Sequence, residues 1–236
     1  PNTNTPRWGK RPFRAPHHTA SASALVGGGR YPRPGEVSLA HHGILFLDEL
    51  PEFDRKVLEV LREPLGSGTI LISRAARQTE FPAAFQLIAA MNPCPCGYLG
   101  DPQGNCRCTS EQIKRYCARI SGPLLDRIDL QIEVPALSAE KLCVTPTTQE
   151  TSAVVLERVK QAIKKQYQRS LKLNARLNSR DIQEHCLLKP IDQNFIKSAV
   201  EKLNLSTRSY YQVLCLARTI GDLMNSDSIE REHVVE

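Results

Sequence analysis

The chain has 236 residues, of which 41% are hydrophobic and 24% charged, as is ordinary for a globular protein. No apolar run approaches the roughly 20 residues of a membrane span, and no signal peptide is visible, so we expect a cytoplasmic protein with no membrane partner. The net charge is +6, and residues 1–35 carry six basic side chains and no acid, which favours nucleic acid as a partner, although a solubilising loop has the same composition.

Proline and glycine interrupt residues 1–42 repeatedly, so little helical periodicity is present. The three glycines at 27–29 do not form a phosphate-binding loop, because such a loop needs Gly-Lys-Ser or Gly-Lys-Thr, and neither occurs in the sequence. Adjacent side chains diverge on strands and helices. We therefore interpret the histidine pairs at 17–18 and 41–42 as packing or hydrogen-bonding residues rather than as metal ligands.

The apolar run Ile-Leu-Phe-Leu at 44–47 predicts a short strand buried on both faces. Asp48 and Glu49 follow at the point where this strand would leave the sheet, and ligands of open α/β sheets bind outside that edge. An apolar strand that ends in Asp-Glu is typical of the Walker B motif, in which the Asp holds Mg²⁺ and the Glu polarises the attacking water. The pattern alone also fits a strand that ends in a solvated acidic turn.

The following elements continue an α/β pattern. Asp54 is expected to open a helix that Pro64 ends. Residues 69–73 and 78–81 predict the two strands of a β-hairpin with a basic tip that carries Arg74 and Arg77.

Two further strands and a helix are predicted before residue 138. The first strand covers residues 85–91, is expected to be buried, and delivers Asn92 to the same sheet edge as Asp48. Residues 111–120 are predicted to be helical. Residues 128–134 alternate apolar and polar side chains, which predicts the last strand.

The character of the chain changes near residue 138. We predict a partial α/β core with a basic N-terminal segment over residues 1–137, a polar linker over 138–150 and a helical domain over 151–236. The helical segments of this domain are expected around Leu156 to Tyr167, after Asn178 or Ser179, from Ile191 to Leu203, from Ser206 to about Asn225, and from about Ser228. In the fourth of these, the residues expected to face inward are Val213, Leu216, Ile220 and Leu223.

Four cysteines have paired spacing, C-x-C, nine residues, C-x-C, and they are Cys94, Cys96, Cys106 and Cys108. Thiolates paired in this way across a loop rich in glycine can hold one tetrahedral Zn²⁺, and four protein ligands leave no open position for catalysis. A redox role and unliganded thiols remain alternatives to a structural zinc site. The other cysteines are scattered and are interpreted as small packed residues: Cys117, Cys143, Cys186 and Cys215.

The order of these features carries a resemblance. The Asp48-Glu49 strand, the basic hairpin and the Asn92 strand are followed by Ser121-Gly-Pro-Leu-Leu-Asp-Arg127 and by a helical domain with Ser206-Thr-Arg208. This order and the local text, including Arg-Pro-Phe-Arg-Ala-Pro-His-His at 11–18, resemble the magnesium-chelatase-like branch of the AAA+ ATPases, and within it the ComM/YifB family. The resemblance covers nearly the whole chain.

The resemblance implies an α/β fold, a partial AAA+ parallel-sheet core of the P-loop NTPase type followed by an all-helical lid domain. It gives Asp48 and Glu49 the roles of Walker B residues, with Mg²⁺ on Asp48, and it makes Asn92 the sensor 1 residue that orients the attacking water near ATP. These roles agree with phosphoryl transfer, which depends mainly on positioning and on cations near the developing charge.

Two arginines take roles from the same resemblance. Arg127 resembles the arginine finger that reaches a neighbouring protomer's nucleotide, with a salt bridge to Asp126 or Asp129 as the alternative. Arg208 resembles sensor 2, which reaches the nucleotide from the lid, with a surface helix cap as the alternative. Arg119 is a weaker candidate for the finger.

The resemblance further implies an ATP-driven hexameric ring that acts on branched or single-stranded DNA, in branch migration during recombination and natural transformation. Arg74 and Arg77 would then contact phosphates in the pore. A metal-chelatase motor subunit and a non-catalytic, zinc-stabilised remnant are the alternatives. Complete family members carry the Walker A loop upstream of residue 1, so we expect a C-terminal portion that lacks the phosphate cradle and is inactive alone.

Overall fold

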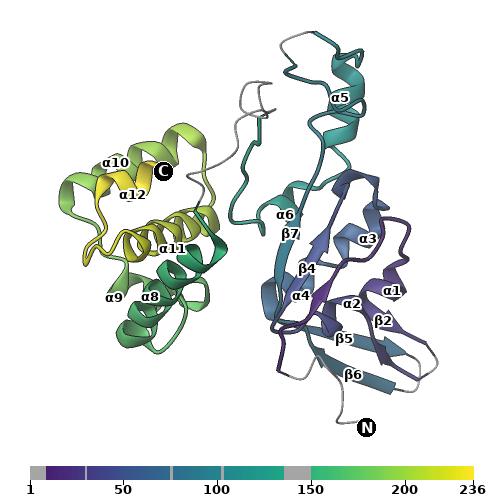
Figure 1. The fold of residues 1–236 in the computed structure, drawn as a ribbon, viewed down its shortest axis with the longest axis horizontal. Helices are drawn as coiled ribbons and strands as arrows, with labels where there is room; N and C mark the ends of the chain where they lie inside the picture. Colours follow the sequence, from purple (N-terminus) through teal and green to yellow (C-terminus); the bar gives the residue numbers. More distant parts are fainter. Residues whose placement is uncertain (1–8, 30, 75–76, 102–103, 136–149) are drawn as a thin grey trace. The chain divides into compact units, whose positions relative to one another are not determined.

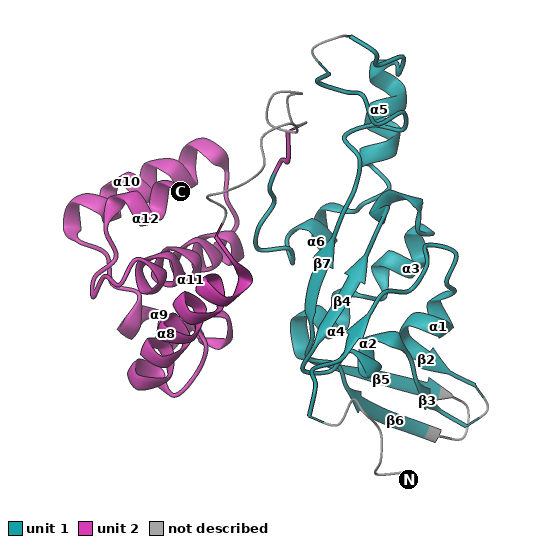
Figure 2. Ribbon diagram, viewed as in Figure 1, with its two compact units in different colours: residues 1–132 teal, residues 133–236 magenta. Residues whose placement is uncertain are grey.

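Figure 1 shows the computed structural model of the chain, which describes residues 9–29, 31–74, 77–101, 104–135 and 150–236. The chain forms two compact units, residues 1–132 and residues 133–236, drawn in two colours in Figure 2. In the described ranges, no helix has both the length and the apolar character that a membrane crossing requires.

The first unit is built around a parallel sheet with the strand order β1-β4-β7. β1 (Phe13–Arg14) pairs with β4 (Ile44–Leu47), and β4 pairs on its other edge with β7 (Gln86–Ala89). The register sets Leu47 of β4 opposite Ala89 of β7. Parallel strands joined by helical connections were predicted from the sequence, and the observed sheet followed by helices confirms the predicted fold class.

Short helices and one face of the sheet enclose the core of the first unit. These helices are α1 (Ala22–Val26), α2 (Glu36–Leu39), η1 (Leu50–Glu52), α3 (Arg55–Glu59) and α4 (Arg62–Ser67). The buried side chains at the centre of this core include Leu25, Val37, Leu45, Leu47, Leu58 and Leu61. Both Leu45 and Leu47 are fully buried while Ile44 and Phe46 are half-buried, so β4 has one buried face and one partly covered face rather than two buried faces.

The glycines at 27–29 allow two backbone segments to lie close together. β2 (Gly27–Gly28) pairs antiparallel with β3 (Arg33–Pro34). Gly27 has φ of 101°, and a Cβ atom at this position would overlap the Arg33 carbonyl oxygen. Any other residue would therefore force the two segments apart.

Pro64 does not end the helix that Asp54 opens. The Asp54 carboxylate caps α3 by accepting a hydrogen bond from Lys56 N at 2.7 Å, as predicted. The chain then begins a second helix, α4, at Arg62, so that Pro64 lies in the first turn of α4. A first-turn proline is tolerated because its missing N–H would have no partner within the helix.

The hairpin forms as predicted, from β5 (Thr69–Arg74) and β6 (Arg77–Pro82), which pair antiparallel in a continuous register. The side chains of Arg74 and Arg77 lie outside the described part of the structure. Their proposed contact with DNA therefore stays a prediction.

Two sequence predictions about the sheet were wrong. β7 is not buried, since Ile88 keeps 40% of its surface exposed. Residues 128–134 form no strand, and Leu130, Ile132 and Val134 are 67%, 83% and 81% exposed. The reason is the same in both cases, because no strand in the described ranges lies on the free edge of β7, so neither segment has a partner there.

The second unit is helical, with α8 (Ser152–Ser170), η2 (Asn174–Arg176), α9 (Ser179–His185), α10 (Pro190–Leu203), α11 (Thr207–Leu223) and α12 (Arg231–Val235). Two of the predicted start signals act as caps: Asn178 forms a capping box with Asp181, and the Ser206 side chain accepts a hydrogen bond from Ser209 N. The buried apolar side chains of the second unit include Ile182, Cys186, Leu214, Ala217 and Ile229.

The buried face of α11 differs from the predicted one. Leu223 is exposed, whereas Arg218 and Asp222 are buried. The Asp222 carboxylate pairs with Arg169 of α8 and lies 3.2 Å from Arg218 of its own helix. Apolar periodicity could not reveal this face, because a buried ion pair replaces apolar side chains on it.

We expect Asp222→Ala to destabilise the helical unit by about 3–5 kcal/mol, since it leaves the buried guanidinium of Arg218 and the partly buried guanidinium of Arg169 without their counter-charge. Urea unfolding followed by circular dichroism measures this change. Asp227→Ala is the control, because Asp227 is fully exposed and lies 4.0 Å from Lys165, and its removal should hardly change the unfolding midpoint. Equal effects of the two substitutions would contradict this account of the buried pair.

Candidate active site

The parallel pairing of β4 and β7 brings the predicted site residues to one edge of the sheet. Beyond the strands, Ala90 N donates to Leu47 O and Leu50 N donates to Ala90 O, both at 2.9 Å. Asp48 and Glu49 lie between these bonds on one chain segment, and Asn92 follows them on the other. All three side chains are exposed, so their oxygen atoms are available to a ligand.

Glu49 has an unusual backbone conformation. Its φ of 53° and ψ of 47° lie in the left-handed region, which a residue with a side chain adopts only at some energetic cost. The Asp48 carboxylate accepts a hydrogen bond from Glu49 N at 2.9 Å and so stabilises this tight turn. The two carboxylates have different partners, since that of Asp48 accepts from Glu49 N and that of Glu49 contacts His18.

His18 contacts Glu49 directly, and sequence reasoning did not foresee this. Its Nδ1 lies 3.0 Å from Glu49 Oε2. The His18 ring is held by His17 at a centroid distance of 4.1 Å and by the edge of Phe53 at 6.4 Å. The histidines were predicted to pack or form hydrogen bonds, which agrees with this contact. The only sequence signal for His18 as a residue of the site was the match of residues 11–18 to a family segment.

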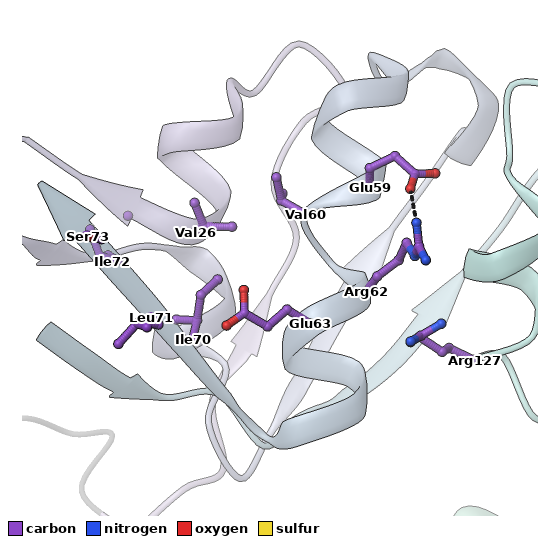
Figure 3. A pocket seen from close by; sticks show the side chains of 11 residues that line it. Val26, Glu59, Val60, Arg62, Glu63, Ile70, Leu71, Ile72, Ser73 and Arg127 are labelled. Carbon is purple, nitrogen blue, oxygen red and sulfur yellow. Dashed lines mark hydrogen bonds and ion pairs between the residues drawn. The ribbon is translucent and has the colours of Figure 1, made fainter. Parts of the chain in front are cut away.

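Arg127 follows α6 (Gly122–Leu125), the short helix that Ser121 caps by accepting a hydrogen bond from Leu124 N at 3.3 Å. Arg127 Nη1 donates to Pro123 O at 2.7 Å, and its Nε is buried without a hydrogen-bond partner. Figure 3 shows Arg127 beside Arg62 and the Glu59–Arg62 pair at one end of a pocket of about 480 Å³. Asp48 and Asn92 are not among the residues that line this pocket.

The other two arginines have different surroundings. Arg119 Nη1 donates to Pro51 O at 2.8 Å and lies 3.1 Å from Glu52, so it is engaged within its own unit. Arg208 is exposed in the first turn of α11, in the second unit. The structure therefore brings together Asp48, Glu49 and Asn92, and it leaves the role of Arg208 a prediction.

The four paired cysteines meet as predicted. Their Sγ atoms all lie within 4.8 Å of one another, with 3.4 Å between Cys94 and Cys96 and 3.8 Å between Cys94 and Cys106. A zinc ion bonded to sulfur at about 2.3 Å has sulfur–sulfur edges of about 3.8 Å, so this donor set fits a tetrahedral metal ion. Hydrogen bonds from the backbone of Tyr98 and then Arg107 lower the pKa of Cys96 to about 6, whereas the hydrogen bond with Cys96 and then burial raise the pKa of Cys108 to about 12, so that in the absence of a metal one thiolate is shared within the cluster.

The remaining cysteines were predicted to be packed. Cys186 is buried in the core of the helical unit, which agrees with this prediction, but Cys117 is exposed. Cys143 lies outside the described residues. The prediction was wrong for Cys117, whose neighbours in the sequence are apolar. This residue lies on the exposed side of α5 (Ser110–Cys117), next to the buried Tyr116.

A parallel sheet with an acidic pair and an amide at one edge, followed by a helical unit, has the fold of a partial AAA+ core and its lid. Residues 2–142 match the family model described as magnesium chelatase, subunit ChlI, and residues 149–236 match the model of its C-terminal part. The chain belongs to this magnesium chelatase ChlI family, and within it to the ComM/YifB group.

Several bacterial relatives match almost the whole chain. The competence protein ComM of Haemophilus influenzae is 52% identical over 99% of this chain. Proteins named YifB from Salmonella typhimurium and Escherichia coli are 51% and 49% identical, each over 98% of this chain. In each case the match covers 45% of the relative, so the chain spans less than half the length of these relatives.

We expect the chain to bind one divalent metal ion through its four clustered thiolates. Titration with Co²⁺, followed by the absorption of a tetrahedral thiolate complex, measures this binding. Binding should weaken as the pH falls, because protons compete for the sulfur atoms. A Cys106→Ser, Cys108→Ser variant should lose the signal and Cys117→Ser should keep it; an unchanged signal in the double variant would rule out this site.

Proposed function

We propose that this chain provides part of the ATP-hydrolysing site of a ring-shaped motor that acts on DNA. The observation that carries the proposal is the pairing of β4 with β7, which sets Asp48, Glu49 and Asn92 at one sheet edge. Carboxylates and a polar amide at the carboxyl ends of neighbouring parallel strands are what phosphoryl transfer to water requires.

Asp48 and Asn92 fit a nucleotide with Mg²⁺, because both offer exposed oxygen donors, the ligand type that Mg²⁺ prefers. When bound, ATP–Mg²⁺ supplies the phosphoanhydride bond and the cation that offsets its charge. Asp48 would hold the cation and Asn92 would orient the water. Glu49 would accept a hydrogen bond from that water and polarise it.

His18 extends this site by one residue. Its contact of 3.0 Å with Glu49 restrains a carboxylate that is otherwise about half exposed. A restrained carboxylate spends more time in the orientation that activates water, and such positioning is a large part of enzymatic rate enhancement. His18 therefore acts through Glu49 and not on the nucleotide itself.

Arg127 is the residue that we propose to act on a neighbouring protomer. The pocket that its side chain lines includes neither Asp48 nor Asn92, which supports a role in which it reaches a second nucleotide site. A ring of identical subunits, for which we propose a hexamer, provides such a site at every interface. Arg208 of the helical lid is proposed to contact the nucleotide as sensor 2.

We propose that the partner is DNA and that the protein acts on it in the cytoplasm. Three features support DNA: the basic residues in the first 35 positions, the hairpin tip with Arg74 and Arg77, and the similarity to a protein named for competence. Branch migration of recombining DNA is the reaction that fits these features best.

A metal-chelatase motor subunit is the second candidate, since the matched family is described as magnesium chelatase subunit ChlI. Such a subunit would use the same nucleotide site and act on a protein partner. Stimulation by DNA separates the two candidates, because only the first predicts it. For the four-thiolate cluster, zinc is the metal that we propose, because its tetrahedral preference matches the donor set.

In the full-length reading frame that contains this chain, ATP hydrolysis should be stimulated by branched DNA. Glu49→Gln should reduce the turnover number at least 10²-fold, while ATP binding persists, because only the water-polarising carboxylate is lost. Glu184→Gln, a change of an exposed carboxylate on α9 of the helical unit, is the control and should hydrolyse ATP normally. Full turnover by the Glu49 variant would refute the site, and turnover indifferent to DNA would favour the chelatase candidate.

His18→Ala should lower the turnover number about threefold to tenfold, the loss expected for one positioning hydrogen bond, with little change in KM for ATP. His42→Ala is the control, because the His42 ring is exposed and lies against His41, not against His18. In the Glu49→Gln background the substitution of His18 should have no further effect. A further loss in that background would mean that His18 acts by another route.

A further inference from the structure

Arg119 starts from a fixed place in the first unit. It follows α5 in the chain, and its backbone N–H donates to Tyr116 O at 3.2 Å. The next residue, Ile120, is 5% exposed and belongs to the buried core of the unit. The backbone of Arg119 is therefore held in position, although its guanidinium is half exposed.

The Arg119 side chain reaches a helix that lies much earlier in the sequence. Its Nη1 donates to Pro51 O, 68 residues away in the chain, at 2.8 Å, and it also lies 3.1 Å from Glu52 Oε2. Pro51 is the middle residue of the three-residue helix η1. The last carbonyl groups of a helix have no partner within the helix, so the guanidinium caps η1 by supplying one.

The helix η1 in turn holds the backbone of Glu49. Glu52 N donates to Glu49 O at 2.7 Å, and Leu50 N donates to Ala90 O at 2.9 Å. On the other side, Glu49 N donates to the Asp48 carboxylate at 2.9 Å. Both backbone polar groups of Glu49 are therefore bonded, one to Asp48 and one to the helix that Arg119 caps.

The conformation of Glu49 needs such support. Its φ of 53° is left-handed, and a residue with a side chain keeps such a conformation only when the surrounding structure holds it there. Leu50 and Phe53 pack into the core and anchor η1, but apolar packing is not directional. The bond to Asp48 joins adjacent residues. The bond from Arg119 adds a directional contact from a distant part of the chain.

We propose that Arg119 is a positioning residue for Glu49, which it holds in the left-handed turn by capping η1 at Pro51 O. This inference rests on the proposed function, because it takes Glu49 as the group that polarises the attacking water. Arg119 then acts within its own protomer and not on a neighbour's nucleotide. A carboxylate on a restrained backbone stays in the orientation that activates water.

Hydrogen exchange tests the cap without any assumption about catalysis. In the full-length reading frame that contains this chain, Arg119→Ala should speed exchange in the peptide that holds the Glu52 amide about threefold to tenfold, as loss of one hydrogen bond implies. Arg115→Ala is the matched control, because Arg115 pairs with Glu111 of its own helix, and exchange there should not change. Mass spectrometry measures both. Unchanged exchange in the Arg119 variant would overturn the inference.

A second variant separates the cap from the ion pair. Glu52→Gln removes the charge beside Arg119 but leaves Pro51 O in place as its acceptor. Because exposed ion pairs contribute little, exchange and turnover should stay close to those of the parent protein. An effect as large as that of Arg119→Ala would overturn the inference, since the ion pair and not the cap would then hold the turn.

Kinetics separate this inference from the function on which it rests. Arg119→Ala should lower the turnover number about threefold to tenfold with KM for ATP nearly unchanged, and Arg115→Ala should not. In a Glu49→Gln background Arg119→Ala should cause no further loss. If Glu49→Gln alone leaves turnover intact, the proposed function fails, and this inference fails with it. If Glu49→Gln lowers turnover but Arg119→Ala does not, or lowers it further in that background, the site stands and the inference is wrong.

Discussion

The parallel pairing of β4 with β7 is the constraint on which the site depends. Two apolar segments about 40 residues apart in the sequence must lie in register for Asp48 and Asn92 to emerge together. Two hydrogen bonds, from Ala90 N to Leu47 O and from Leu50 N to Ala90 O, extend this register past the ends of the strands. Glu49 adopts its left-handed conformation between Leu47 and Leu50, whose backbone groups both bond to Ala90.

Two features of the first unit lie next to these site residues. His18, from the segment that follows β1, contacts Glu49, while the cysteine cluster begins two residues beyond Asn92. Both lie in segments without regular strand pairing. Such contacts order polar groups that a sheet edge alone would leave mobile.

Short-range signals in the sequence predicted most elements, because their causes are local. The caps at Asp54 and Asn178 satisfy backbone groups that only their own helices expose. Burial was predicted less well, since it depends on partners elsewhere in the chain. The alternating residues 128–134 read as a strand, yet the described structure gives them no neighbouring strand, and Asp222 reads as a surface residue although two arginines hold it in the core. The contact between Glu49 and His18 was not predicted either, because neither local sequence pattern indicates the other residue as a partner.

The most direct test of this account is a structure of the full-length reading frame, carrying Glu49→Gln, with Mg²⁺, ATP and branched DNA. We expect the cation beside Asp48 and the terminal phosphate within reach of Asn92. We further expect Arg127 of each protomer to be directed at its neighbour's nucleotide. Nucleotide bound away from the edge formed by β4 and β7 would contradict the central claim.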